Sequence, residues 1–358
     1  MGSLTTRGVR ALSGAAGVTV GLWALLLAAP ALGPLDAGDF TTAAATLGVP
    51  HPTGFPTLTM LGYAASLVPV ANIAARVAWT SAVVMAGAAA LLAHLFARTA
   101  RTAAEAWLAA VAVVTAVIVM PTLSIHARVP EAYGLSLLLV IASVWLQAQL
   151  AATDDERWAG LLGLVLGLGV AHHALFRLWA PCVALWSLAQ APAGRRPFRA
   201  LWLTLFGLGG LSAIAYLPAA ALRDGPHNWG DPSTPMALWR VFMASDIREA
   251  FAGEMGSLAG VHSAVSHFAA QLHGPWPFVA LAGTVAMAFD RQSDRRLLAL
   301  LAVVEVVYAV VINPMGLVDL QNGQLVALVL GPFAAAALGR LAGEQPRRAL
   351  AAGAAGTA

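Results

Sequence analysis

The sequence predicts an all-α fold of about ten transmembrane helices, and three observations lead to that prediction. Only 10% of the 358 residues are charged and 59% are hydrophobic, whereas a soluble domain has about a quarter of its residues charged. The mean hydropathy is +0.76. Apolar runs of about 20 residues, the length that crosses a bilayer, recur from one end of the chain to the other. A single transmembrane domain is therefore expected over residues 1–341, followed by a flexible cytoplasmic tail at 342–358.

The predicted spans follow one another along the whole chain. They cover residues 11–34, 77–97, 102–122, 131–150, 158–173, 175–191, 199–221, 274–290, 297–313 and 323–341. The first run follows Arg7 and Arg10, as in a signal peptide. It is long, however, and no small-residue cleavage site clearly follows it, so we expect a retained helix.

Two segments fit this pattern less simply. Residues 57–71 are too short to cross a bilayer and are predicted to form a re-entrant or interfacial helix. Residues 158–191 fit either one broken span or two short ones, because His172, His173 and Arg177 interrupt the apolar sequence.

The placement of arginine predicts the orientation. All 20 basic residues are arginines, which is typical of GC-rich bacterial coding, and most lie in every second connection of the ten-span arrangement. The positive-inside rule puts these connections and the N-terminus in the cytoplasm, across a bacterial inner membrane. The opposite, periplasmic or exterior, side then holds two longer segments, which we name the first long loop (35–76) and the second long loop (222–273). This placement of arginines explains the pI near 9.6. The predicted partner is therefore the lipid bilayer and not nucleic acid.

The sequence predicts no metal site made by protein ligands alone. The single cysteine, Cys182, excludes an internal disulfide and a cysteine-based metal site. His172 and His173 are adjacent, so they do not share a helix face, and no HExxH-like spacing occurs.

Acidic residues open the first long loop, in the run LDAGDFTTAAATLGVPHPTGFPTL. Asp36 and Asp39 are three residues apart, so on a helical turn their carboxylates lie on one face. His51 follows between two prolines that fix the backbone around it. Such a pair is typical of a general base or a cation site. The alternative is that the aspartates only cap and solubilise the loop.

Further polar clusters lie at the same predicted face of the membrane. Their members are His126, Arg128, Glu131 and Tyr133; His172, His173 and Arg177; Asn228, Trp229, Asp231 and Thr234; and Asp319, Gln321 and Asn322. An arginine within a span costs about 2.5–3.5 kcal/mol on insertion scales, so Arg177 is expected to face a cavity or a partner, unless it snorkels to the interface. Trp229 and Trp239 fit either an interfacial aromatic belt or a surface for stacking a sugar ring.

Several of these motifs together resemble a bacterial family of polytopic membrane proteins that also includes a vertebrate transmembrane protein O-mannosyltransferase. The resemblance lies in DAGD (36–39), LGVPHPTGFP (47–56), PEAY (130–133), GVAHH (169–173) and NWGDP (228–232). The family pattern is D-x-G-E followed by L-G-(I/V)-x-H-P-x-G-(Y/F)-P. The His-Pro-x-Gly block is fairly specific, and the matches extend through most of the chain.

The resemblance implies a GT-C-type glycosyltransferase fold and a polyprenyl-phosphate sugar donor, with an acceptor hydroxyl that the sequence leaves unidentified. In that class an acidic residue of the first outer loop serves the reaction. The family often has Glu where this chain has Asp39, and the shorter side chain makes Asp36 the first choice for the base. Arginines suit the donor phosphate, and histidines add hydrogen bonds. The candidates for these contacts are Arg128, Arg177, Arg223, His51 and His172.

Other interpretations stay open. A divalent cation, Mg²⁺ or Mn²⁺, would fit two carboxylates and a phosphate. A transporter or flippase of lipid-linked sugar would place ionisable groups near the bilayer midplane, as Glu305 in LLALLAVVEVVYAVV does, where it either pairs with a buried arginine or histidine or marks a conduction path. The third hypothesis is a non-catalytic scaffold, in which the acidic pair is expendable.

Overall fold

The computed structural model describes residues 3–29, 33–34, 36–254, 257–313 and 323–355. Within these ranges the regular structure is helical, apart from one isolated parallel bridge between Val49 and Asn228. The predicted all-α fold is therefore confirmed.

Ten helices correspond to the ten predicted spans. They are α1 (Thr6–Leu26), α4 (Ile73–Arg98), α5 (Ala103–Val119), α7 (Ala132–Thr153), α8 (Arg157–His172), α9 (Phe176–Gln190), α10 (Arg196–Leu211), α15 (Trp276–Ala288), α16 (Ser293–Val307) and α17 (Gln324–Ala355). The connections carry α2 (Ala37–Thr46), α3 (Pro56–Ser66), α6 (Pro121–His126), α11 (Tyr216–Ala221), α12 (Pro235–Met243), α13 (Ser245–Ala250) and α14 (Leu258–Ala270).

Five helical segments of the described residues are long and apolar enough to cross a membrane. These are Thr6–Leu26, Ile73–Arg98, Ala132–Thr153, Ala193–Ala221 and Gln324–Ala342. Ala103–Val119, Arg157–His172 and Trp276–Ala288 are apolar but shorter. The count of ten spans stays a prediction.

The structure changes some predicted boundaries. The first helix begins at Thr6 and not at residue 11, because the Thr5 side chain accepts a hydrogen bond from the Gly8 N–H and caps the helix there. Residues 158–191 form two helices, α8 and α9, which pack against each other. Most of residues 57–71, predicted as a re-entrant or interfacial helix, lie in the short helix α3, and its position relative to the membrane stays a prediction. The predicted tail at 342–358 continues α17 as a helix to Ala355.

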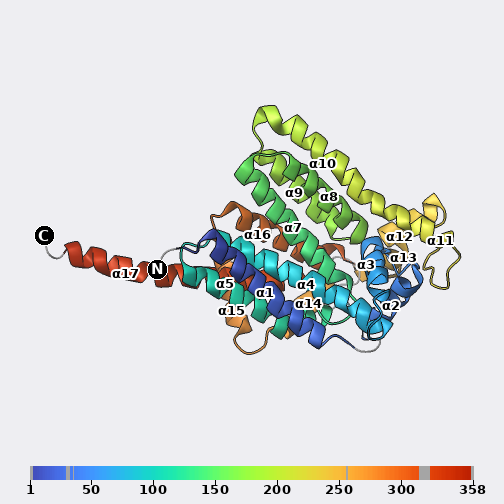
Figure 1. Ribbon diagram of the computed structural model, residues 1–358, viewed down its shortest axis with the longest axis horizontal. Helices are drawn as coiled ribbons and strands as arrows, with labels where there is room; N and C mark the ends of the chain where they lie inside the picture. Colours follow the sequence, from blue (N-terminus) through green and yellow to red (C-terminus); the bar gives the residue numbers. More distant parts are fainter. Residues whose placement is uncertain (1–2, 30–32, 35, 255–256, 314–322, 356–358) are drawn as a thin grey trace.

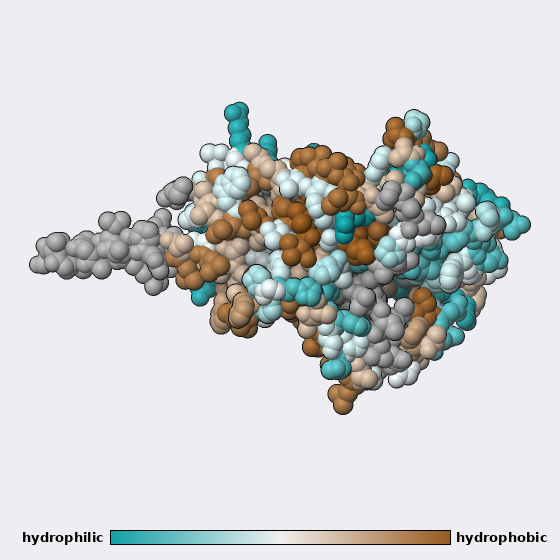
Figure 2. All heavy atoms as spheres, turned by 90° about the horizontal axis from the view of Figure 1, so that it is seen from below, coloured by the Kyte–Doolittle hydropathy of each residue, from teal (hydrophilic) through white to brown (hydrophobic). Residues whose placement is uncertain are grey.

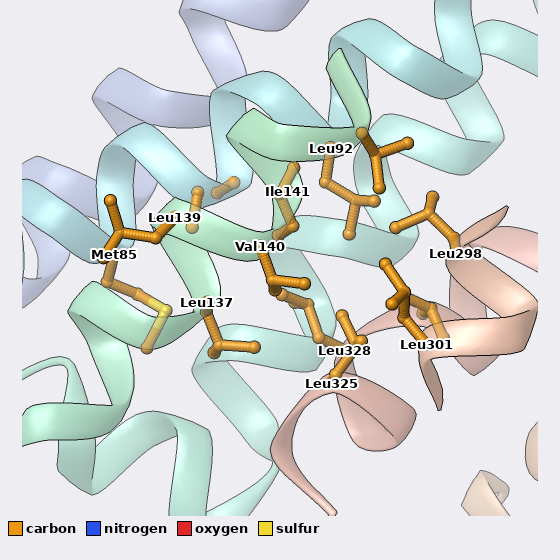
Figure 3. Close-up of a cluster of buried hydrophobic side chains, with 14 of the residues drawn as sticks. Met85, Leu92, Leu137, Leu139, Val140, Ile141, Leu298, Leu301, Leu325 and Leu328 are labelled. Carbon is orange, nitrogen blue, oxygen red and sulfur yellow. The ribbon is translucent and has the colours of Figure 1, made fainter. Parts of the chain in front are cut away.

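The helices form an elongated bundle (Figure 1). The short helices α2, α3, α11, α12 and α13 gather at one end, and the N-terminus and the end of α17 lie at the other. Pairs that pack closely include α1 with α4, α5 with α17 and α8 with α10. Leucine, isoleucine, valine and methionine side chains from α4, α7, α16 and α17 fill the interior (Figure 3). Apolar side chains also cover much of the face in Figure 2, while hydrophilic ones gather at the end that carries α11 and α12.

Glycines bring α8 and α10 into backbone contact. A Cβ added at Gly163 or Gly167 would collide with the carbonyl oxygen of Leu203 or Gly207, and one at Gly210 with that of Leu164. Close approach through small residues is a common way to join transmembrane helices. Since α10 leads through α11 into the second long loop, this contact fixes the place where that loop begins.

Buried ion pairs hold together the end of the bundle opposite α2 and α3, which we name the basic end. Arg295 is fully buried, and its guanidinium lies 3.3 Å from carboxylate oxygens of both Glu105 and Asp290. Arg340 also pairs with Asp290, at 3.2 Å. Buried Arg199 makes a similar set of contacts, with Glu156 at 3.0 Å and Asp154 at 3.4 Å. Several of the arginines predicted to be cytoplasmic therefore join helices, in addition to any role in orientation.

Glu305 caps a helix. Its carboxylate oxygens accept hydrogen bonds from the backbone N–H groups of Leu325 and Val326, at 3.1 and 2.9 Å, in the first turn of α17. A carboxylate is favourable there because the first N–H groups of a helix have no partner within the helix. These contacts replace the buried arginine or histidine that the sequence suggested as a partner.

Candidate functional site

The two long loops meet in a short stretch of backbone pairing. The Val49 N–H donates to the His227 carbonyl oxygen at 2.8 Å, and the Trp229 N–H donates to the Val49 carbonyl oxygen at 3.0 Å. Gly48 permits this approach, because an added Cβ would collide with the His227 carbonyl oxygen. The Tyr216 hydroxyl also donates to the Gly48 carbonyl oxygen, at 2.8 Å. Arg223 also donates to the Leu47 carbonyl oxygen, across a separation of 176 residues. The two loops, far apart in sequence, therefore build one surface, which we call the site end.

Asp39 lies at the centre of the site end, held between two histidines. Its Oδ2 is 2.6 Å from His51 Nδ1 and 3.0 Å from the His51 backbone N–H. Its Oδ1 is 2.6 Å from His227 Nε2. Both carboxylate oxygens are thus engaged, one by each long loop, and the side chain is only 16% exposed.

Opposing effects act on the charge of Asp39. Burial favours the neutral acid and raises its pKa, but the hydrogen bonds from the His51 side chain and backbone and from His227 outweigh burial, so the pKa of Asp39 lies below the ordinary 3.8. Asp39 is therefore a fixed anion at neutral pH and a poor proton acceptor.

Asp36 is the more accessible of the two carboxylates. It precedes the first residue of α2, and its side chain is 49% exposed. Its Oδ2 lies 3.6 Å from His51 Nε2, so His51 stands between the two aspartates. The Asp36 backbone N–H donates to Oε1 of fully buried Glu131 at 3.3 Å, and the Glu131 N–H donates to Ser81 Oγ. Glu131 therefore fixes the backbone that carries Asp36.

Aromatic rings connect His51 with the other predicted histidines. The Phe55 ring centroid lies 5.1 Å from that of His51 and 5.6 Å from that of His172. The Tyr133 ring packs against His173 at 5.2 Å, and it also stacks on His126 at 5.0 Å. His172 is itself buried, with Nε2 3.0 Å from the Ala132 carbonyl oxygen. These contacts bring five predicted residues into one cluster, which reaches the aspartates through His51. Its members are His51, Tyr133, His126, His172 and His173.

Trp229 and Asp231 lie at the rim of this cluster. Trp229 is 53% exposed, and its ring centroid is 6.5 Å from that of His51. Asp231 accepts a hydrogen bond from the Asn228 side chain at 3.1 Å. Gly230, with φ of +69°, allows the turn between them. The hydrogen bond from the Trp229 N–H to the Val49 carbonyl oxygen thus holds a partly exposed indole ring next to His51.

The three candidate arginines differ in their surroundings. Arg177 donates to the Phe242 carbonyl oxygen, and its guanidinium lies 4.2 Å from the centre of the Phe242 ring. Arg128 donates to Ser124, and exposed Arg223 donates to the Leu47 carbonyl oxygen at the end of α2. No ion pair with a carboxylate is found for these arginines among the described residues.

Some predicted features are not tested by this geometry. Asp319, Gln321 and Asn322 lie outside the described residues. In the part of the chain that is described, no group of three or more His, Cys, Asp or Glu side chains could hold a metal ion. Both oxygens of Asp39 lie within hydrogen-bond distance of histidines, and the divalent cation shared by Asp36 and Asp39 stays a prediction.

The sequence interpretation overlooked His227. It begins the HNWGDP segment, of which only the residues after it were selected. A histidine directly before a candidate sugar-binding motif was the available indication. Its partner, Asp39, lies 188 residues earlier, and local spacing carries no information about such a contact.

The chain is similar to known proteins over much of its length. Residues 36–193 match a family described as the N-terminal domain of protein O-mannosyl-transferase TMEM260. The protein O-mannosyl-transferase TMEM260 of mouse is 29% identical over 236 residues, which are 64% of this chain and 33% of the mouse protein. The chain therefore spans about a third of the length of this curated relative.

These similarities support the predicted relation to a vertebrate O-mannosyltransferase. Together with the apolar helices, they identify the chain as an integral membrane protein related to glycosyltransferases. The matched range includes Asp36, Asp39 and His51 and ends before His227. His227, the second histidine at Asp39, thus lies outside the family match.

Proposed function

We propose that the protein is a membrane glycosyltransferase of the GT-C type that moves a sugar from a polyprenyl-phosphate donor to an acceptor hydroxyl. The observation that supports it most is the arrangement of two carboxylates with unequal environments on a loop surface at one end of the bundle. Asp36 is half exposed, while Asp39 is held by His51 and His227. A reaction that needs one available base and one fixed anion fits this difference.

In this mechanism Asp36 is the general base. It removes the proton from the acceptor hydroxyl as the acceptor oxygen attacks the anomeric carbon of the donor sugar. The bond from that carbon to the phosphate oxygen breaks, and its electron pair leaves on the phosphate. A single displacement of this kind inverts the anomeric configuration. The phosphate is already a stable anion, so the reaction needs cationic contacts more than an acid.

Arg177 is the first choice for the donor phosphate. It lies at the start of α9, next to the His173 segment, and its described contacts are the carbonyl oxygen and ring of Phe242, with no carboxylate. A guanidinium in this state keeps N–H donors for phosphate oxygens. Arg128 and Arg223 are further candidates, and Trp229 offers a ring face to the sugar. The 6.5 Å between the ring centroids of Trp229 and His51 supports this assignment, because His51 contacts both aspartates.

The site is proposed to face the periplasm or exterior of a bacterial inner membrane, with the N-terminus in the cytoplasm. The support is the arginine distribution. The basic end carries Arg195, Arg199, Arg295 and Arg340, and the short helices α2, α3, α12 and α13 of the two long loops lie at the other end.

The experiment is transfer of radiolabelled sugar from a panel of polyprenyl-phosphate donors in membranes that carry the wild type or Asp36→Asn. We expect label in an acceptor fraction with the wild type and a loss of about 10²–10⁴-fold in Asp36→Asn. The matched control is Asp246→Asn, an exposed aspartate of the second long loop that pairs with Arg240. Equal transfer by wild type and Asp36→Asn would remove Asp36 from the reaction. Absence of transfer by the correctly inserted wild type from every donor would favour a transporter of lipid-linked sugar.

A further inference from the structure

The hydrogen bonds of His51 determine which of its ring nitrogens faces the reaction. Nδ1 lies 2.6 Å from Asp39 Oδ2, and the same oxygen accepts the His51 backbone N–H at 3.0 Å. Two bonds to one oxygen hold the ring in a single orientation. Nδ1 therefore carries the proton that Asp39 accepts, and Nε2 is left on the opposite side of the ring. That nitrogen lies 3.6 Å from Asp36 Oδ2.

Asp39 is itself fixed from the other side. His227 Nε2 lies 2.6 Å from Asp39 Oδ1, and His227 belongs to the backbone pairing with Val49. The groups thus follow one another in the order His227, Asp39, His51 and Asp36. His227 and His51 both lie within hydrogen-bond distance of Asp39. The 3.6 Å between His51 and Asp36 is longer than a hydrogen bond and closes with a small side-chain movement.

We propose that His51 is a proton relay behind Asp36, with Asp39 and His227 as the positioning residues that hold its ring. This inference rests on the proposed function, because it takes Asp36 as the base. Asp36 accepts the proton of the acceptor hydroxyl and passes it to His51 Nε2, which leaves Asp36 ionised for the next turnover. The resulting imidazolium donates to Asp39 through Nδ1 and releases a proton to solvent at the rim, where its side chain is 19% exposed.

The surroundings of His51 favour this direction of transfer. The charged groups that face it among the described residues are Asp36 and Asp39, from the start of α2. His173, from the connection between α8 and α9, is near enough to interact electrostatically, and His227 reaches it through Asp39. The rest of its environment is the rings of Phe40, Phe55 and Trp229. The two carboxylates are thus the proton partners within reach of its two ring nitrogens, Asp39 at Nδ1 and Asp36 at Nε2.

The first test measures the contact between Asp36 and His51 without sugar transfer. Diethylpyrocarbonate reacts with neutral imidazole, so the rate of modification of His51 against pH, followed by peptide mass spectrometry, gives a titration midpoint. In Asp36→Asn we expect the midpoint to move to lower pH, because the imidazolium loses a neighbouring negative charge. Exposed His262 serves as the reference within the same molecules and should not move. An unchanged His51 midpoint in Asp36→Asn would overturn the relay.

The second test uses transfer activity. His51→Asn keeps an amide that can donate to Asp39 but has no counterpart of Nε2. We expect kcat to fall about tenfold to 10²-fold, and the acid limb that an imidazole gives to the pH–rate profile to disappear. His262→Asn should leave both unchanged. A wild-type kcat and pH profile in His51→Asn would contradict the proposal.

The two tests separate the relay from the function on which it rests. Absence of transfer by the wild type would overturn the proposed function itself. Transfer by the wild type that is lost in Asp36→Asn, together with an unchanged His51 midpoint, would keep the function and overturn the relay alone.

Discussion

Ionic groups are used differently at the two ends of the bundle. At the basic end, arginines that are always charged meet carboxylates in buried contacts, as Arg295 does with Glu105 and Asp290. At the site end, the carboxylate of Asp39 meets two histidines, whose ring nitrogens can donate or accept a proton, and Asp36 is half exposed. The contacts of the basic end suit permanent links between helices, and those of the site end suit the proposed proton transfer. The two ends therefore differ in the partner of the carboxylates, arginine or histidine, and in how far water reaches them.

The largest expected effect comes from the basic end. Arg295→Ala leaves Glu105 and Asp290 buried without their main partner, which should cost about 3–5 kcal/mol of stability. Thermal unfolding of the purified protein in detergent measures it. Arg296→Ala changes the adjacent, exposed arginine and should have little effect. Equal unfolding temperatures for the two variants would show that burial of the ion pair contributes nothing.

Asp39→Asn tests the site end and adds a pH dependence. Loss of charge-assisted hydrogen bonds to His51 and His227 should cost about 1.5–3 kcal/mol at neutral pH. Because the folded pKa of Asp39 is below 3.8, the wild-type contribution is complete above that pH and is lost as the pH falls through the folded value. Stability measured from pH 7 down to pH 3 should therefore decline less in Asp39→Asn than in wild type. Parallel curves would show that Asp39 is not ionised preferentially in the folded state.

Gly210→Ala disturbs the site end without changing a charge. Its added Cβ meets the Leu164 carbonyl oxygen, so α10 must move away from α8, at a cost of about 1–3 kcal/mol. Because α10 leads into the second long loop, activity should fall as well. Gly209→Ala is the matched control, since an added Cβ there meets nothing within 4 Å. Similar unfolding temperatures and activities for both variants would mean that the α8–α10 contact tolerates separation.

The smallest effect is expected for an exposed ion pair near the site. Arg240 and Asp246 pair on the surface of the second long loop, with side chains 48% and 60% exposed. Asp246→Asn should leave the unfolding temperature and the transfer rate unchanged, because exposed pairs are screened by solvent. A measurable loss of transfer would place this pair in substrate binding.

The sequence predicted the helical class and most of the helix positions, because apolar length and polar turns are local properties. It also selected Asp36, Asp39 and His51 as a group. It did not predict that Asp39 is held by two histidines, and it did not include His227, since both facts depend on a contact between loops that are far apart in sequence. The roles of Arg199 and Arg295 were missed for a related reason. An arginine near a span end appears the same in sequence whether it faces water or a buried glutamate.

The pairing of Val49 with His227 has a consequence for the order in which the protein matures during translation. Asp39 and His51 are synthesised early and can meet within the first long loop, since only 12 residues separate them. His227 emerges from the ribosome 188 residues after Asp39, when α4 to α10 have already been made. Until then Asp39 has one of its two histidines, and the Val49 N–H lacks its carbonyl partner. A nascent chain that stalls before residue 227 would therefore carry Asp39 and His51 without the second histidine of the site.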